Sequence, residues 1–440
     1  MKRISVIGLG KLGAPMLAVF CEAGFDVVGV DTNPEYVAQI NVARAPVVEP
    51  DLQHLLTKHR AKYYTTASTR EAVLASEATF VIVPTPTGDD GGFVLDYVTP
   101  CCEDIGAALR EKQGYHLVVV TSTVMPGHMR DICATLEAAS GKQHGADFGL
   151  CYSPEFIALG SVIHDSLHPD YALVGEEDTR AGDALAAIYH LVHDAPVVRM
   201  NWVNAEITKI AQNSFITQKI TFANQLSMLC GHIPGANVDD VSRALGHDRR
   251  VGKHYLKGGT AFGGPCFPRD SRAFNRAARN AGTALPMAVL TDRLNHQMID
   301  ELRHTITLHA QPGQVVGILG LAYKPGTPVV EESASLILIR QLLPAYTVVV
   351  YDALALDEAR KSLPVGVGVE YAQTAGACVR CADVVVLMLG DYNLVKNLLF
   401  RDRVLIDPWR VMLPYTFACK RYVPLGVGAI EQAETERRTV

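Results

Sequence analysis

Short apolar runs alternate with amphipathic stretches over the first 200 residues of the chain. The stretches between the runs, such as residues 11–23 and 95–109, have the periodicity of helices packed on one side. The runs themselves have the length of buried strands and are bounded by turn or polar residues: RISVIGL, DVVGVD, TFVIVP, HLVVVTS, FGLCYS, YALVGE and APVVRM. Buried strands that alternate with helices predict a parallel, doubly wound sheet over residues 1–200.

The pattern changes after residue 200. Residues 204–230 contain neither proline nor glycine, which predicts one long helix, and further helices are expected at 270–281 and 287–308. Alternation then resumes with QVVGILGLAYK, YTVVVYD, ADVVVLML and RVLIDPW. The expected fold class is α/β, with two Rossmann-like doubly wound domains joined by a long central helix and a helical dimerisation region. The domain bounds are 1–200, 201–310 and 311–428, followed by a polar tail at 429–440.

Composition narrows the class of protein. The 440 residues are 48% hydrophobic and 20% charged, as in an ordinary soluble globular protein, and the net charge is −6. We see no basic stripe that would bind nucleic acid and no apolar run long enough for a membrane helix. The opening MKRISVIGLG is too short and glycine-rich for a secretory signal, and the 10 cysteines show no disulfide framework. A cytoplasmic enzyme with reduced thiols is expected.

The glycines of VIGLGKLG directly follow the first predicted strand. Gly8, Gly10 and Gly13 would form a tight turn into a helix, where a pyrophosphate can sit on the helix N-terminus. Asp31 ends the second predicted strand, where a carboxylate accepts hydrogen bonds from an adenosine ribose. Because that carboxylate would repel a 2′-phosphate, the pattern favours NAD over NADP and indicates an oxidoreductase.

Several further motifs follow one another along nearly the whole chain: VPTPTGDDG, TSTVMPG, SPEF, AEITKIAQNSF, RRVGKHYLKGGTAFGGPCFPRD and GILGLAYKPGT. Together with the glycine turn they resemble the UDP-glucose/GDP-mannose dehydrogenase family. The resemblance implies oxidation of the C6 hydroxymethyl of a nucleotide sugar to a carboxylate, with two NAD consumed in one active site. No metal is expected.

The resemblance makes Cys266 the nucleophile of this reaction. Its thiolate would capture the aldehyde from the first oxidation as a thiohemiacetal, a second hydride transfer would give a thioester, and water would hydrolyse it. Pro268 and Asp270 indicate a helix that begins beside Cys266, whose N-terminus would favour the thiolate anion.

The resemblance also implies the other catalytic residues. Lys209 and Asn213 are four residues apart on the long predicted helix and so share one face, where they would stabilise the alkoxide at C6. Asp270 and Thr123 would position a water molecule for proton transfer. Glu155 of the SPEF motif would help to activate the hydrolytic water.

Two sets of binding residues follow from the same resemblance. Arg250 would reach into the neighbouring subunit's site and make the enzyme a homodimer. Lys324, in the last domain, would reach the nucleotide side of the substrate. The expected NAD-binding residues are Gly8, Gly10, Leu12, Gly13, Asp31, Pro84, Thr85 and Thr123, and the expected substrate-binding residues are Glu155, Phe156, Lys209, Asn213, Arg250, Tyr255, Lys257, Gly263, Gly264 and Lys324.

The chain departs from the family's pattern at several positions. Leu159 stands where a glutamate is usual, Glu331 where an arginine is usual, and Tyr36 where a basic residue often follows the ribose-binding acid. Loss of one acid and one base near the cofactor suggests altered NAD contacts or domain closure with unchanged chemistry. Trp409 takes the place of a nucleotide-side arginine, with Arg410 next to it, and the role of Arg410 stays open.

The substrate also stays open at this point. UDP-glucose is the first expectation, oxidised to UDP-glucuronate as in polysaccharide biosynthesis, with GDP-mannose next and UDP-N-acetylhexosamines as a further alternative. A single-step β-hydroxyacid or 6-phosphogluconate-type dehydrogenase shares the two-domain plan and a helix-borne lysine but needs no cysteine. A non-catalytic nucleotide-binding subunit is disfavoured by the presence of Lys209, Asn213, Cys266 and Asp270 together.

Overall fold

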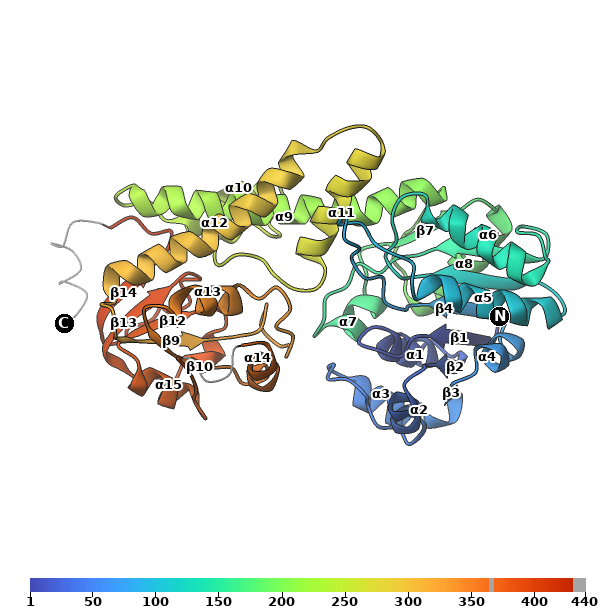
Figure 1. Cartoon of the computed structure of the whole chain (residues 1–440), viewed down its shortest axis with the longest axis horizontal. Coiled ribbons are helices and arrows are strands. Elements are labelled where there is room, and N and C mark those ends of the chain that lie inside the picture. Colours follow the sequence, from blue (N-terminus) through green and yellow to red (C-terminus); the bar gives the residue numbers. More distant parts are fainter. Residues whose placement is uncertain (364–367, 430–440) are drawn as a thin grey trace. The chain divides into compact units, whose positions relative to one another are not determined.

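The computed structural model describes residues 1–363 and 368–429 of the chain (Figure 1). These residues form two compact units, the first made of Met1–Ala211 with Arg279–Ala281 and the second of Gln212–Ala278 with the chain from Gly282 onward. Helix α9 (Trp202–His232) begins in the first unit and ends in the second. The predicted polar tail lies, from residue 430 on, outside the described residues. None of the described helices is long and apolar enough to cross a membrane.

The first unit is built on an eight-stranded sheet with the order β3-β2-β1-β4-β5-β6-β7-β8. The expected sheet is wholly parallel, but β7 pairs antiparallel with β6, because the chain between them holds only the short helix α7 (Val162–Leu167) and no crossover helix. Strand β3 is not predicted from the apolar pattern, since it reads YYTT at the sheet edge. The strands are β1 (Arg3–Ile7), β2 (Asp26–Val30), β3 (Tyr63–Thr66), β4 (Ala78–Val81), β5 (His116–Val120), β6 (Phe148–Tyr152), β7 (Ala172–Glu176) and β8 (Val197–Met200).

Helices cover both faces of this sheet and bury its apolar side chains. One core joins the sheet to α1 (Gly13–Glu22), α3 (Leu52–Lys58), α7 and α8 (Thr179–Val192). The opposite core joins it to α4 (Thr69–Ala75), α5 (Val98–Glu111) and α6 (His128–Ser140), and α5 and α6 lie side by side in Figure 1. Helix α2 (Pro34–Asn41) follows β2. The first unit is therefore doubly wound, as the alternating pattern predicts.

The second unit contains a six-stranded parallel sheet with the order β11-β10-β9-β12-β13-β14. Helices α12 (Pro286–His309), α13 (Ala334–Leu342) and α14 (Leu356–Ser362) share one core with it, and α15 (Ala375–Cys381) packs on the other face. Helices α10 (Val238–His247) and α11 (Phe267–Asn280) precede α12. The strands are β9 (Val315–Leu319), β10 (Thr347–Tyr351), β11 (Val369–Tyr371), β12 (Val384–Leu387), β13 (Phe400–Asp407) and β14 (Cys419–Pro424).

Strand order determines where each sheet can bind a ligand. In open α/β sheets ligands bind beyond the carboxyl ends of the strands, at the point where the strand order reverses. That point lies between β1 and β4 in the first sheet and between β9 and β12 in the second. The predicted NAD-binding residues lie in the loops after β1, β2, β4 and β5 and at the start of α1, and the loop after β9 carries Lys324.

Candidate functional site

The turn between β1 and α1 has the geometry of a pyrophosphate cradle. A methyl group at Gly13 would lie 1.7 Å from the carbonyl oxygen of Gly8, so only glycine lets the helix approach the strand this closely. A methyl group at Gly10 would meet nothing within 4 Å, which leaves space above the turn. No side chain caps α1, whose N-cap is Leu12. The Ala14 N–H donates to the Gly10 carbonyl oxygen at 3.2 Å and Pro15 has no N–H, so an anionic group would bind at the turn itself, before Ala14.

Asp31 lies directly beyond β2 and faces this turn. The backbone N–H of Leu9 donates to its Oδ2 at 2.6 Å, and the N–H of Asn33 donates to its Oδ1 at 2.8 Å. These bonds fix the carboxylate, and since a carboxylate has about four acceptor positions, both oxygens can still accept ribose hydroxyls. The residues present thus fit the adenosine side of NAD. Tyr36 lies in the first turn of α2, five residues after Asp31, and is half-buried.

The loops after β4 and β5 lie against each other at the same edge of the sheet. The Ser122 hydroxyl donates to the carbonyl oxygen of Val83 at 2.6 Å and so links the two loops. Pro84 is exposed, Thr85 is buried and Thr123 is half-buried. These three predicted residues are therefore held at one edge, beside the glycine turn of β1.

Lys209 and Glu155 meet within the first unit. The Lys209 ammonium donates to the backbone carbonyl of Glu155 at 2.6 Å and lies 4.9 Å from the ring centroid of Phe156, and it is only 7% exposed. Burial raises the pKa of the Glu155 carboxyl to about 7, and the positive charge of Lys209 opposes this rise. A carboxyl that titrates near neutrality can take a proton from water. Leu159, four residues after Glu155, is half-buried.

Cys266 lies immediately before the first residue of α11. Its carbonyl oxygen accepts the Asp270 N–H at 2.8 Å, the first bond of the helix, and its side chain is exposed. Other cysteines are buried, and burial raises the pKa of the Cys21, Cys102 and Cys378 thiols to about 12. Cys381 is also exposed but is the last residue of α15. All ten cysteines lie in the described part of the chain, and Cys266 is the exposed one at a helix N-terminus.

Asn213 and Asp270 are joined in the second unit. The Asn213 Nδ2 donates to Asp270 Oδ2 at 2.6 Å, and the Arg269 Nε donates to Asp270 Oδ1 at 3.2 Å. The Asp270 side chain is buried, so these bonds replace the water that a carboxylate would otherwise bind. The structure thereby brings together, one helical turn from Cys266, two of the predicted catalytic residues.

The glycine loop before Cys266 is a fixed segment of backbone. Residues 258–264 are buried, whereas Lys257 and Tyr255 are exposed. A methyl group at Gly264 would lie 2.5 Å from the Tyr323 ring, and the Gly264 N–H donates to the carbonyl oxygen of Glu331 at 3.0 Å. Gly263 lies equally close to the backbone of Glu332. The glycine positions of the loop have no room for a side chain.

Arg410 is held inside the second unit. Its guanidinium forms a two-bond pair with Asp239 on α10, at 2.8 and 2.9 Å, and donates to the carbonyl oxygen of Gly258 at 2.7 Å. It is 3% exposed. The indole N–H of Trp409 donates to the Met388 carbonyl at 2.9 Å. The Arg410 guanidinium therefore links α10 to the glycine loop.

The remaining predicted residues are more exposed. Arg250, in the turn after α10, has a side chain that is 84% exposed and pairs with Asp248. Lys324 is half-buried in the loop after β9, and the Glu331 side chain is exposed. Asp239 is missing from the sequence-based set, because its partner lies 171 residues away and no local motif links them.

A glycine turn at a topological switch point, with an acid placed for the ribose, defines an NAD-dependent dehydrogenase. Comparison with family models narrows this class. The NAD-binding, central and UDP-binding domains of the UDP-glucose/GDP-mannose dehydrogenase family match residues 2–193, 203–297 and 317–414 respectively. The chain belongs to this family and is an NAD-dependent nucleotide-sugar 6-dehydrogenase. The resemblance seen in the sequence, the expected fold class and the expected cofactor are confirmed.

Individual relatives match over most of their length. The chain is 35% identical to a UDP-glucose 6-dehydrogenase of Haloferax volcanii, over 93% of this chain and 97% of the relative. It is 34% identical to a GDP-mannose 6-dehydrogenase of Pseudomonas aeruginosa, over 85% and 83%. A solved UDP-glucose dehydrogenase of Pyrobaculum islandicum is 32% identical, covers 97% of this chain and 98% of its own, and has a TM-score of 0.89.

Proposed function

We propose that the substrate is UDP-glucose and the product UDP-glucuronate. The match of residues 317–414 to a UDP-binding domain and the similarity to the Haloferax volcanii enzyme support this substrate. GDP-mannose is the second candidate, because the identity to the Pseudomonas aeruginosa GDP-mannose enzyme is almost as high. The test is NADH production with a panel of UDP-glucose, GDP-mannose and UDP-N-acetylhexosamines. A kcat/KM at least about tenfold higher for UDP-glucose is expected, and a preference for another sugar would replace this proposal.

We propose further that Cys266 forms the covalent intermediate. NAD, when bound, accepts one hydride from C6 in each of the two oxidations. The Cys266 thiolate adds to the aldehyde carbon, and its sulfur stays bonded to that carbon as the thiohemiacetal is oxidised to a thioester. Water then breaks the carbon–sulfur bond, which releases the carboxylate and restores the thiol. The exposed position of Cys266 at the start of α11 is the observation that supports this role most strongly.

The other side chains are proposed to move protons and stabilise charge. Lys209 and Asn213 would stabilise the alkoxide at C6, and Asp270 with Thr123 would position a water molecule. Glu155 would take a proton from the hydrolytic water, which its raised pKa supports. Replacing Cys266 with serine tests the core of this proposal: acid formation should stop while the fold is kept. Unchanged acid formation would overturn it.

A homodimer through α9 is also proposed. Phe215, Phe222 and Leu229 are seven residues apart along the helix and are 62%, 52% and 56% exposed. Large apolar side chains at this spacing form one stripe that a second helix would cover. Arg250 would then reach the neighbouring site from its exposed turn. Light scattering should give twice the mass of 47.7 kDa, and Phe222→Glu should give the monomer. A wild-type monomer would contradict the proposal.

We propose the cytoplasm as the compartment. The ten cysteines are all free thiols, which suits a reducing environment, and the reaction consumes NAD. Fractionation of the source cells with an antibody to the chain should recover it with cytoplasmic markers, and recovery outside the cytoplasm would contradict this.

A further inference from the structure

The glycine loop is held by amide side chains from two helices. Asn224 on α9 accepts the Gly259 N–H at 2.8 Å and donates to the Thr260 carbonyl at 3.2 Å. Asn295 on α12 accepts the Phe262 N–H at 2.8 Å and donates to the Phe262 carbonyl at 2.9 Å. Each asparagine thus pairs with the backbone through both its oxygen and its nitrogen, as a neighbouring strand would.

These contacts are enclosed. Asn224 is 4% exposed and Asn295 is 6% exposed, so the bonds do not compete with bulk water. The segment they hold belongs to no helix or strand, and its buried N–H and C=O groups need partners from elsewhere. Side chains from α9 and α12 supply those partners over residues 259–262.

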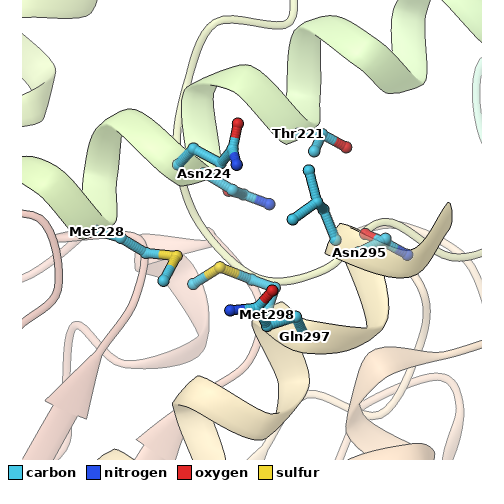
Figure 2. A pocket seen from close by; sticks show the side chains of 8 residues that line it. Thr221, Asn224, Met228, Asn295, Gln297 and Met298 are labelled. Atoms are coloured by element: carbon cyan, nitrogen blue, oxygen red, sulfur yellow. The ribbon is translucent and has the colours of Figure 1, made fainter. Parts of the chain in front are cut away.

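Packing of the loop on α9 accompanies these bonds, since a methyl group at Gly258 would lie 2.7 Å from the carbonyl oxygen of Ala223. A cavity of about 110 Å³ lies between α9 and α12, and Figure 2 shows Asn224 and Asn295 on its walls, together with Thr221, Gln297 and the methionines Met228 and Met298. The residues that line this cavity come from the two helices, so the cavity separates the helices from each other and not from the loop. The hydrogen bonds of the two asparagines add fixed directions to the packing that holds the loop.

The restraint continues along the chain to Cys266. Arg410 holds the Gly258 carbonyl at one end, and the Gly264 N–H is bonded to Glu331 at the other. Two residues after Gly264 comes Cys266, whose carbonyl begins α11. Five of the seven residues from Gly258 to Gly264 are consequently held by these bonds, with the asparagine contacts in the middle.

We propose that Asn224 and Asn295 are positioning residues for the Cys266 thiol. They act through the loop backbone and touch neither substrate nor cofactor in this assignment. The inference rests on the proposed nucleophilic role of Cys266. A displaced thiol captures the aldehyde more slowly, so the intermediate escapes after the first oxidation. The first hydride transfer itself does not use the thiol.

The test compares Asn224→Ala and Asn295→Ala with Thr221→Val and Gln297→Ala in the full-length enzyme. The control positions line the same cavity on the same two helices and bond no loop backbone in the contacts described above. The readouts are kcat, KM for the nucleotide sugar, NADH formed per sugar consumed, and aldehyde trapped with semicarbazide. A loss of about 10²-fold in kcat for acid formation is expected for the asparagine variants, with a smaller loss in the first release of NADH and KM changed less than about threefold. Their NADH ratio should fall from about two toward one as trapped aldehyde appears.

If the alanine variants do not fold, Asn224→Asp and Asn295→Asp are measured in their place. Each keeps the size of the side chain and the oxygen that accepts the loop N–H, so smaller losses with the same change in ratio are expected. Three outcomes would overturn the inference: asparagine variants that behave like the controls, a raised KM with unchanged kcat and ratio, or lost activity that follows the lowered melting temperature at a ratio of two. Cys266→Ser is measured in parallel. If it still forms acid, the covalent proposal fails; if it does not, a normal ratio in the asparagine variants defeats this inference alone.

Discussion

The amide of Asn213 donates a 2.6 Å hydrogen bond to the buried carboxylate of Asp270, across 57 residues of sequence. This bond fixes the Asn213 amide, because its nitrogen must face Asp270 and its oxygen must face away. It also joins the long helix α9 to the first turn of α11, directly after Cys266. The orientation of a catalytic asparagine and the start of the nucleophile's helix thus depend on one contact.

Loss of this contact should weaken both folding and turnover. In Asn213→Ala the buried Asp270 carboxylate loses a donor, which should lower the free energy of unfolding by about 1–3 kcal/mol. The kcat should fall about 10²-fold, since a donor to the developing alkoxide is lost as well. Urea denaturation and steady-state kinetics measure the two effects. Asn204→Ala, on the exposed side of the same helix, is the matched control, and equal behaviour of the two variants would refute this reading.

The glycine turn allows a paired test of the NAD site. Gly13→Ala places a methyl group 1.7 Å from the Gly8 carbonyl, so the first unit should be strongly destabilised. Gly10→Ala meets no protein atom within 4 Å and should leave the melting temperature within a degree or two of wild type, about what a surface change does. It should nevertheless raise the KM for NAD about tenfold or more, because the methyl occupies the pyrophosphate's space. A Gly10→Ala enzyme with normal NAD kinetics would show that the cofactor does not cross this turn.

The raised pKa of the Glu155 carboxyl lets us predict how hydrolysis of the thioester depends on pH. Burial raises the pKa of its carboxyl to about 7, so the carboxylate that takes a proton from water accumulates only as pH rises through about 7. Acid formation in a single turnover should therefore slow as pH falls below 7, while release of the first NADH changes less. Glu155→Gln should be slow at every pH and lose this inflection. An inflection that persists in the glutamine variant would assign it to another group.

Because Asp239 pairs with the buried Arg410, we expect its replacement to destabilise the protein more than replacement of its neighbour Asp240 on α10. Asp239→Asn leaves a buried guanidinium without its anion, which should lower the free energy of unfolding by about 3 kcal/mol. Asp240→Asn removes only an exposed pair with Arg243 and should cost about 0.5 kcal/mol or less. Thermal melting of both variants decides the point. Similar melting temperatures would mean that the Arg410 pair is not a brace.

Local sequence patterns were enough to predict most of the helices and strands. The contacts that they did not predict join residues far apart along the chain. The strand runs follow from the alternation of apolar segments, the glycine turn follows from its motif, and the helix over 204–230 follows from the absence of proline and glycine. The helix beside Cys266 follows from Pro268 and Asp270. The β3 edge strand is too polar to be recognised by its apolar content.

The contacts that sequence reasoning misses are those between distant segments. Nothing near Arg410 identifies Asp239, and nothing near the glycine loop identifies Asn295, because each pair meets only after two helices pack. Asn224 did carry a signal: it lies 11 residues after Asn213, about three helical turns, and so falls on the same face of α9. A second amide on that face indicates a second polar partner.

The central claim is a four-electron oxidation that passes through the Cys266 thiol. Its most direct test is the number of NADH molecules formed for each UDP-glucose consumed, measured with wild type and Cys266→Ser under the same conditions. We expect about two for wild type with UDP-glucuronate as the product, and no acid from the serine variant. A wild-type ratio of one, or acid formed at the normal rate without the thiol, would contradict it.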